Sequence, residues 1–408
     1  MTSVHWRQRW FFSAPAIAIL IGHFCVDIFS SMVPPLIGVV EREFQMSSAM
    51  AAWLLVMGSV CSGLAQPLFA WISDRSGTRI YGPLGVLLAS IFIGLIGFSG
   101  TAFNVFLIYA IGMMGIGMFH PIATAKIGAI AGEQRGFAIS LFFVFGMAGF
   151  FSGSLLGPFL VTLGSTIKML GYLVVPGLVI AVLLHLNINK QSTTAATQEV
   201  PIMPLSSYDW WSIVPLYFSA VLRFMVNLAI IYLIVRWVET DVASLNPELG
   251  EKEVSLISTP SVGKAHAIMF VGQGLSGLLA GALIKQGKES WPLILTPILF
   301  APCLMSLAFL KPGAVSFAVC TFVGIGYAAM TPITISVGQQ LMPGHTRLAS
   351  GLLLGGAWAV GSVGSGLAEL GIANFGLPNT ILTTGIVLMF AGILSLGVKC
   401  PQGSSVAG

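Results

Sequence analysis

Apolar stretches of about 20 residues, the length that a helix needs to cross the hydrocarbon core of a bilayer, recur along the whole chain. Of the 408 residues, 56% are hydrophobic and 8% are charged, which excludes a soluble domain of this size. We therefore expect an all-α integral membrane protein. Its twelve predicted transmembrane helices lie at residues 14–37, 49–72, 81–99, 104–125, 138–162, 169–188, 212–236, 262–284, 292–310, 314–340, 349–372 and 378–398.

A polar stretch at residues 189–207 interrupts this series between the sixth and seventh apolar segments. Its glutamine, serine, threonine and proline residues favour neither a packed core nor a membrane span. We therefore predict an N-terminal six-helix half at 1–188, a cytoplasmic linker at 189–211 and a C-terminal six-helix half at 212–408.

The two halves resemble each other at a nearly constant spacing. His120 and Thr331, each followed by a proline, are 211 positions apart, and Arg135 and Arg347, each opening a glycine-rich helix, are 212 apart. These pairs indicate two pseudo-repeats of six helices each in parallel orientation. In transporters built this way the substrate site lies near the middle of the membrane, between the repeats.

Lysine and arginine predict the orientation. With both termini cytoplasmic, more than half of the 18 basic residues lie on the cytoplasmic side, as the positive-inside rule requires. On the outer side we expect residues 238–261, which include Glu239, Asp241 and Glu248, to form an acidic, loosely ordered loop. The net charge of +4 is small and the basic residues are scattered, so nucleic acid is not expected as a partner.

Ionisable residues inside two predicted spans are the candidates for proton coupling. His23 and Asp27 lie one helical turn apart and share a face, which must look into the bundle or a wet cavity. Burial disfavours the charged forms of both groups, so the pair can take up and release protons near neutral pH. The alternative is a hydrogen-bonded pair that only fixes the first helix to a neighbour.

His120 is the third candidate for proton coupling. It precedes Pro121, whose missing N–H favours a bend that places the imidazole in the cavity. The alternative is that His120 only satisfies the carbonyl that Pro121 leaves free.

Arg223 is the one arginine that we place well inside a predicted span, with Asn227 one turn later. A permanently charged guanidinium at that depth suits an anionic substrate group such as a carboxylate or phosphonate. The alternatives are an ion pair with Asp27 or a position nearer the membrane surface. We predict Arg223 and Asn227 as substrate-binding residues.

Several motifs resemble a known family. The turn at 70–79, A-W-I-S-D-R-S-G-T-R, is similar to the major facilitator signature between helices 2 and 3, with Ala70 in place of the first glycine. Taken in order, the remaining motifs resemble the fosmidomycin-resistance branch of bacterial major facilitator efflux proteins. They are His23-x-x-x-Asp27, Gln66-Pro67, Phe119-His120-Pro121, Gly153-x-x-x-Gly157-Pro158 and Leu341-Met-Pro343-Gly344. The chain departs from this pattern at Ile284-Lys285 and Gln340, where acidic residues are expected.

The resemblance implies proton-coupled efflux of a small anionic or amphiphilic compound across a bacterial inner membrane by a monomer. It adds Gln66 to the predicted substrate residues. It also implies that charged residues near the cytoplasmic turns form a gate, although they could instead serve membrane topology alone. The predicted gating residues are Asp74, Arg75, Gly77, Arg79, Arg135 and Arg347.

Small residues repeat every three or four positions in the fifth predicted helix. Such spacing lets two helices approach closely and slide past each other. The predicted packing residues are Gly149, Gly153, Gly157 and Pro158.

Catalysis is not expected, because the sequence contains no nucleophile–base set, metal-ligand spacing or phosphate-binding loop, and the five cysteines are odd in number and widely spaced. We expect no cofactor. The expected partners are protons, the lipid bilayer and a small-molecule substrate. An uptake symporter for an organic anion would use the same residues in the opposite direction, and a membrane sensor or assembly protein could keep the fold without transport.

Overall fold

The computed structural model describes residues 10–76, 80–188, 204, 207–283, 289–328, 331–343 and 345–399. Within these ranges all regular secondary structure is helical. Nine helical stretches there are long and apolar enough to cross a membrane, and two shorter apolar helices lie at Tyr81–Ile93 and Ser290–Ser306. With the more polar helix α9, these segments correspond to the twelve predicted spans. The prediction of an all-α membrane protein is confirmed.

The first six predicted spans form a series of long helices, some of them extended by a short 3₁₀ or π turn. Its elements are α1 Ala14–Met32, η1 Pro34–Leu36, α2 Ile37–Glu43, α3 Ser48–Ser76, α4 Tyr81–Leu88, η2 Ala89–Ile93, η3 Ile96–Phe98, α5 Ala102–Ala131, η4 Gly132–Gln134, α6 Arg135–Gly164, η5 Ile167–Leu173 and α7 Val174–Asn187.

The second series is more interrupted, and two of its spans are divided into shorter helices. Its elements are α8 Trp210–Leu245, α9 Glu251–Leu283, α10 Ser290–Ser306, α11 Ala314–Ala328, α12 Thr331–Leu341, α13 Thr346–Ser350, η7 Gly351–Gly356, α14 Ala357–Gly361, α15 Gly364–Phe375, α16 Leu377–Leu394 and η8 Ser395–Gly397.

The prediction of a loosely ordered loop at 238–261 is wrong. Helix α8 continues to Leu245, and α9 begins at Glu251, so only five residues separate the two helices. Glu251 and Glu253 lie in the first turn of α9, where negative charge interacts favourably with the helix dipole. The carboxylate of Glu253 also accepts a hydrogen bond from the backbone N–H of Gly250 at 3.0 Å. The acidic residues therefore start a helix here and do not mark a loop.

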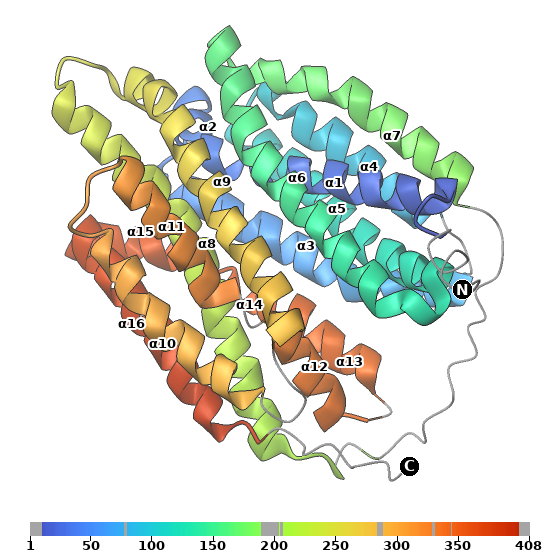
Figure 1. Ribbon diagram of the computed structural model, residues 1–408. Coiled ribbons are helices and arrows are strands. Elements are labelled where there is room, and N and C mark those ends of the chain that lie inside the picture. Colours follow the sequence, from blue (N-terminus) through green and yellow to red (C-terminus); the bar gives the residue numbers. More distant parts are fainter. Residues whose placement is uncertain are drawn as a thin grey trace, which may run out of the picture. The chain divides into compact units, whose positions relative to one another are not determined.

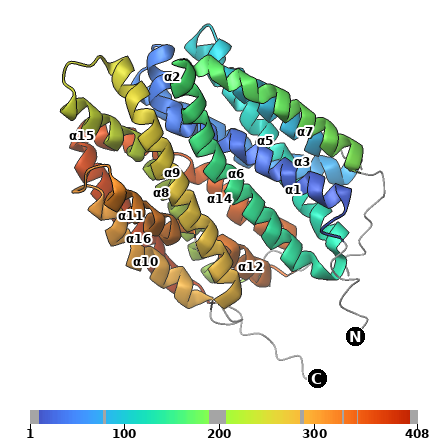
Figure 2. The same ribbon diagram turned by 45° about the horizontal axis from the view of Figure 1, so that its top comes forward.

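The chain divides into two compact units, and each is described by itself. Unit 1 comprises Met1–Thr197 and Val242–Ala267, and unit 2 comprises Gln198–Asp241 and Ile268–Gly408. In unit 1, α1 packs along α6 and also contacts α5 and α7, while α3 packs along α5 (Figures 1 and 2). In unit 2, α10 packs between α16 and α11. Most of the predicted linker lies outside the described residues.

Glycines on α6 allow the close contact with α1. A Cβ added at Gly149 would overlap the carbonyl oxygen of Phe24, and one at Gly153 would overlap that of Ile28. Gly157 lies against Met32 in the same way, so three of the four predicted packing residues line this contact. The fourth, Pro158, lies against Gly263 in the part of α9 that belongs to unit 1.

The same kind of contact recurs in each unit, as the predicted repeat requires. On α11, a Cβ at Gly324 would overlap the carbonyl oxygen of Met269 on α9, and on α5 one at Gly117 would overlap that of Ser62 on α3. The two glycines are 207 positions apart, and so are their partners. Equivalent residues are thus 207 positions apart on these helices, whereas His120 and Thr331, which precede prolines, are 211 apart. The second half therefore has four extra residues between Gly324 and Thr331.

Candidate functional site

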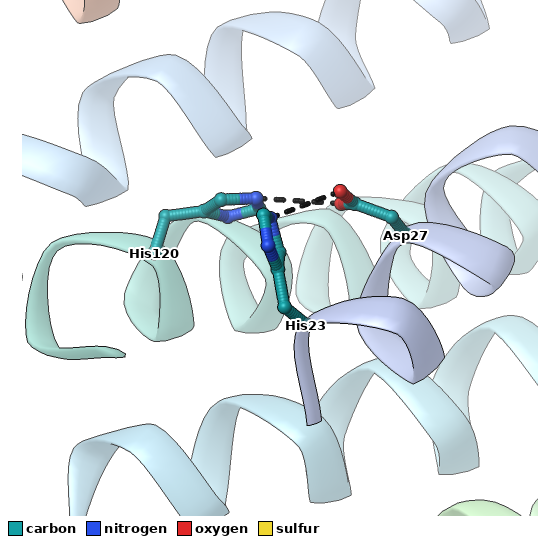
Figure 3. A group of neighbouring side chains, drawn as sticks. All are labelled: His23, Asp27 and His120. Carbon is teal, nitrogen blue, oxygen red and sulfur yellow. Dashed lines mark ion pairs between the residues drawn. The ribbon is translucent and has the colours of Figure 1, made fainter. Parts of the chain in front are cut away.

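Asp27 on α1 lies between two histidines in unit 1 (Figure 3). Its Oδ2 is 3.1 Å from Nε2 of His23, one helical turn earlier, and its Oδ1 is 3.3 Å from Nε2 of His120 on α5. The side chains of Asp27 and His23 are each 2% exposed, whereas that of His120 is 23% exposed. The structure therefore brings together all three residues that we predicted for proton coupling, with one histidine as the accessible side of the group.

The partners of the other ring nitrogens fix the histidine tautomers. Nδ1 of His23 lies 2.7 Å from the carbonyl oxygen of Phe142, and Nδ1 of His120 lies 2.7 Å from that of Ile116. Because a carbonyl oxygen only accepts hydrogen bonds, both Nδ1 atoms carry the hydrogen. His120 bonds the carbonyl of Ile116, although the carbonyl freed by Pro121 is that of Gly117. The His120 ring therefore does not satisfy the carbonyl of Gly117 that Pro121 leaves without a donor.

These tautomers determine how many protons the cluster can hold. A neutral imidazole protonated at Nδ1 presents a lone pair at Nε2, and an ionised carboxylate presents only lone pairs. Each contact between Nε2 and the carboxylate is attractive only if a proton lies in it. One proton satisfies one contact and leaves the cluster neutral, while a second satisfies both and gives a net charge of +1. Oδ1 of Asp27 is buried, and its described polar contact is the one with His120 at 3.3 Å, so both contacts of the carboxylate depend on protons at the imidazoles.

Two residues of α6 complete the surroundings of this cluster, and our sequence analysis did not assign them to it. The ring of Phe142 stacks on His23 with centroids 3.6 Å apart and planes at 13°. A Cβ added at Gly146 would lie 2.5 Å from Cε1 of His23 and 2.6 Å from Oδ2 of Asp27. Gly146 belongs to the same glycine series as Gly149, but only the packing of α6 on α1 shows that it faces the ionisable pair.

Arg223 lies deep in unit 2 on α8, and its side chain has few partners. The residue is 4% exposed. Its Nε donates to the carbonyl oxygen of Ser219 at 3.2 Å, and Nη2 donates to the hydroxyl of Thr334 on α12 at 2.7 Å. Nη1 is buried without a hydrogen-bond partner among the described residues. The side chain borders a small cavity, with room for about one water molecule, that Phe224 and Leu353 also line.

The other two predicted substrate residues differ in their surroundings. Asn227 follows Arg223 by one turn and is 5% exposed, and its Oδ1 is also buried without a partner within the described part of the chain. Gln66 is half-buried on α3 in unit 1. A buried polar atom without a partner is costly, so the pair on α8 indicates a place where a ligand or water supplies the missing bonds.

The predicted gating residues are described only in part. Arg75, at the end of α3, is exposed, and its guanidinium lies 3.9 Å from the ring centroid of Trp71. Gly77 and Arg79 lie outside the described residues. For Asp74, Arg135 and Arg347 the structure describes only the helical backbone. The gating role of this group remains a prediction.

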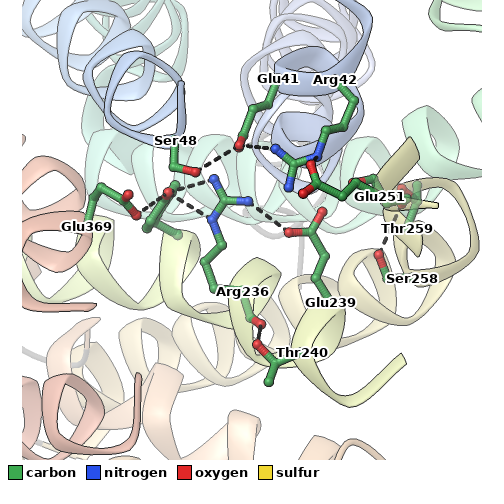
Figure 4. A network of polar contacts seen from close by, with 12 residues as sticks. Glu41, Arg42, Ser48, Arg236, Glu239, Thr240, Glu251, Ser258, Thr259 and Glu369 are labelled. Carbon is green, nitrogen blue, oxygen red and sulfur yellow. Dashed lines mark hydrogen bonds and ion pairs between the residues drawn. The ribbon is translucent and has the colours of Figure 1, made fainter. Parts of the chain in front are cut away.

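Unit 1 holds a second buried carboxylate that our sequence analysis missed. Glu41 on α2 is 1% exposed, bonded to Arg42 and, at 2.9 Å, to the hydroxyl of Ser48 (Figure 4). Nε of Arg42 lies 3.2 Å from Oε2 of Glu251 at the start of α9. Unit 1 therefore buries Glu41 as well as Asp27. Glu41 follows the predicted end of its span, and α1, η1 and α2 together extend that span to Glu43.

Unit 2 likewise buries a second arginine. Arg236 on α8 is 9% exposed, and its Nη1 donates to Oε2 of Glu239 at 2.8 Å (Figure 4). Its Nε and Nη2 both donate to the hydroxyl of Tyr232, at 2.8 and 2.7 Å, and this hydroxyl donates to Oε2 of Glu369 on α15 at 2.7 Å. The expectation that Arg223 is the only arginine well inside a span is wrong, because α8 extends nine residues beyond its predicted end at 236.

Comparison with known protein families and proteins agrees with this architecture. The profile of the family described as Major Facilitator Superfamily matches residues 19–347. The chain is 21% identical over 404 residues to the uncharacterized MFS-type transporter YfnC of Bacillus subtilis (strain 168), covering 95% of this chain and 93% of that protein. It is 25% identical over 143 residues to the fosmidomycin resistance protein of Escherichia coli (strain K12), covering 35% of this chain and 34% of that protein.

Solved transporter structures share the fold. A D-xylose-proton symporter matches with a TM-score of 0.72 at 14% identity, covering 95% of this chain and 98% of that one. A bacterial homologue of the human lysosomal transporter Spinster, in an inward-facing and occupied conformation, matches with a TM-score of 0.70 at 15% identity, covering 93% and 95%. At these identities the likeness concerns the fold alone.

Proposed function

The chain belongs to the major facilitator superfamily, and from this membership we propose that it is a secondary active transporter that expels a small anionic or amphiphilic compound in exchange for protons. It works by alternating access, as a monomer, in a bacterial inner membrane with both termini cytoplasmic. The observation that carries the proposal is the contact of both His23 and His120 with one buried carboxylate, that of Asp27.

This cluster supports proton coupling because its two contacts cannot both be attractive without two protons. Uptake of a proton from outside makes the second of the two contacts attractive, and release of that proton to the cytoplasm makes it repulsive again. The partly exposed ring of His120 gives protons a route to the otherwise buried carboxylate. Ionisable groups inside membrane spans commonly form proton relays of this kind.

Arg223 supports an anionic substrate. A guanidinium that is 4% exposed, with one unbonded Nη1 and no carboxylate among its described contacts, leaves a positive charge uncompensated. Burial of such a charge is expensive unless an opposite charge pairs with it. A carboxylate or phosphonate group bound to the free edge of the guanidinium, with Asn227 one turn away, would supply that charge through a bidentate contact. The similarity to a fosmidomycin resistance protein over 143 residues supports a role in resistance to a small compound, which efflux would provide.

Transport assays in vesicles test both parts of the proposal. Purified protein would be reconstituted with a pH-sensitive dye inside, and an outward or inward pH gradient would be imposed while phosphonates and organic anions are supplied. We expect substrate and protons to move in opposite directions. Substrate added outside should therefore discharge a pH gradient that is acidic inside the vesicles. Movement of protons and substrate in the same direction would instead identify an uptake symporter. Transport that leaves the pH unchanged would refute proton coupling.

A further inference from the structure

The His23–Asp27–His120 cluster also has the composition of a transition-metal site. It offers two imidazole nitrogens and one carboxylate, and the three ligand atoms all lie within 4.8 Å of one another. Imidazole and carboxylate together are ligands that Zn²⁺ and its neighbours in the first transition row accept, whereas Mg²⁺ and Ca²⁺ require mainly oxygen. We propose that this cluster binds one divalent transition-metal ion of the Zn²⁺ type.

The separations between the ligand atoms fit one small ion. Bonds of 2.0–2.1 Å at the tetrahedral angle place neighbouring ligand atoms about 3.3 Å apart. In the structure, Nε2 of His23 is 3.1 Å from Oδ2 of Asp27, and Nε2 of His120 is 3.3 Å from Oδ1. Both nitrogen–oxygen separations match this value, although they involve different oxygens of the carboxylate. Since one ligand atom of each residue lies within 4.8 Å of the others, rotations of the three side chains bring them onto one ion and leave the fourth tetrahedral position for water or another ligand, as in zinc sites with an open position.

The hydrogen bonds on the far side of each ring support the same assignment. Histidines that bind metals through Nε2 commonly donate Nδ1–H to a backbone carbonyl or a carboxylate, which fixes both ring orientation and tautomer. Here Nδ1 of His23 faces the carbonyl oxygen of Phe142, and Nδ1 of His120 faces that of Ile116, each at 2.7 Å. Both rings thus direct the Nε2 lone pair at the carboxylate. Without a proton or a cation, each Nε2 lone pair repels the carboxylate of Asp27. A metal ion bound between them removes this repulsion, because the nitrogens and the carboxylate then all bind the ion.

Charge and access permit such an ion in a membrane protein. One divalent ion, one carboxylate and two neutral imidazoles carry a net charge of +1, the same as the cluster with two protons. Surroundings that accept one of these states therefore accept the other. The 23% exposure of His120 provides an entry path to the site, and the missing side chain at Gly146 lets α6 pack closely against His23 and Asp27 without blocking their ligand atoms.

The metal and the protons would compete for the same lone pairs. A metal-bound cluster cannot take up protons at Nε2 or at the coordinating carboxylate oxygens, since metal ligands must be deprotonated. The site should therefore switch proton-driven transport off when the ion binds. This consequence rests on the proposed proton coupling, whereas metal binding itself does not.

Cobalt provides a direct measurement, because Co²⁺ in a tetrahedral site absorbs visible light much more strongly than hydrated Co²⁺. Tag-free protein in detergent would be freed of metal with a chelator and titrated with Co²⁺. We expect one equivalent to bind with an intense visible spectrum, and equimolar Zn²⁺ to abolish that spectrum. Replacing any one ligand, as in H23Q, D27N or H120Q, should weaken binding by more than about 100-fold, since even the loss of an outer partner costs about 10- to 100-fold.

His185→Gln on α7 is the matched control, because His185 is exposed and lies outside the cluster. This variant should bind Co²⁺ like the unmodified protein. Zinc-edge X-ray absorption of the unmodified protein tests the ligands without relying on variants, and should find two imidazole nitrogens at about 2.0–2.1 Å. A shell of oxygen alone, no stoichiometric Co²⁺ spectrum, or binding by H23Q and H120Q as tight as that of the unmodified protein would overturn the metal site. If the protein binds Co²⁺ but moves no protons when it is reconstituted free of metal, the proposed coupling is refuted and the metal site stands.

Discussion

Replacing Gly146 by alanine perturbs the ionisable cluster from a neighbouring helix without changing any of its titratable groups. The new Cβ would lie 2.5 Å from Cε1 of His23 and 2.6 Å from Oδ2 of Asp27. Non-bonded carbon atoms are in favourable contact at about 3.5–4.0 Å, so the pair must retreat by about 1 Å. The contact between Nε2 and Oδ2 is 3.1 Å long, near the upper limit for a hydrogen bond, so unequal displacement of the two side chains breaks it.

The expected effect of Gly146→Ala follows from that displacement. A hydrogen bond to a charged group contributes about 1.5–3 kcal/mol, which corresponds to about 10- to 150-fold in proton affinity. Overpacking of the contact between α6 and α1 lowers the free energy of unfolding by about a further 1–3 kcal/mol. We expect the variant to enter the membrane and bind substrate while its proton-driven transport falls at least about tenfold.

Gly157→Ala is the matched control on the same helix. Its Cβ would lie 2.9 Å from Cβ of Met32 on α1, so it disturbs the same helix contact about three turns from the cluster. Both variants would be reconstituted and compared for transport driven by a pH gradient and for substrate exchange without one. We expect only Gly146→Ala to lose transport driven by a pH gradient while it retains substrate exchange. Equal losses in both variants, or full coupling in Gly146→Ala, would refute it.

Three further substitutions test other parts of the molecule. Asp27→Asn should still bind substrate and permit exchange but abolish accumulation driven by a pH gradient; normal accumulation in vesicles would remove Asp27 from the coupling step. Arg223→Lys should weaken binding of an anionic substrate because a point charge replaces a bidentate fork, and Arg223→Ala should weaken it more; equal affinities in equilibrium binding assays would give Arg223 a structural role. Tyr232→Phe removes the hydroxyl between Arg236 and Glu369 and should reduce the free energy of unfolding by about 1–3 kcal/mol, and an unchanged denaturation midpoint in detergent would contradict this.

Charged residues near span ends were predicted less well than the spans themselves. Hydropathy treats a charge as the end of a membrane segment, so the predicted spans end at residues 37 and 236, which leaves Glu41 outside its span and Arg236 at the end of the other. In the structure both are buried, because each is paired with a neighbour on its own helix, Arg42 and Glu239. Pairing lowers the cost of burial, and no hydropathy average contains it. The acidic stretch between α8 and α9 was mispredicted because hydropathy does not contain the favourable interaction of Glu251 and Glu253 with the dipole of the helix that they begin.

The sequence by itself determined the class of protein, the number and approximate position of the spans, and the sharing of one helix face by His23 and Asp27. These features depend on interactions within a segment: the length of an apolar run and the 3.6-residue period of a helix. Tertiary structure alone decided that His120, from α5, faces the same carboxylate, and that Gly146 leaves the room for this contact. Such proximity follows from the packing of α5 and α6 on α1, where closely fitting side chains set the distances between segments about a hundred residues apart in the chain.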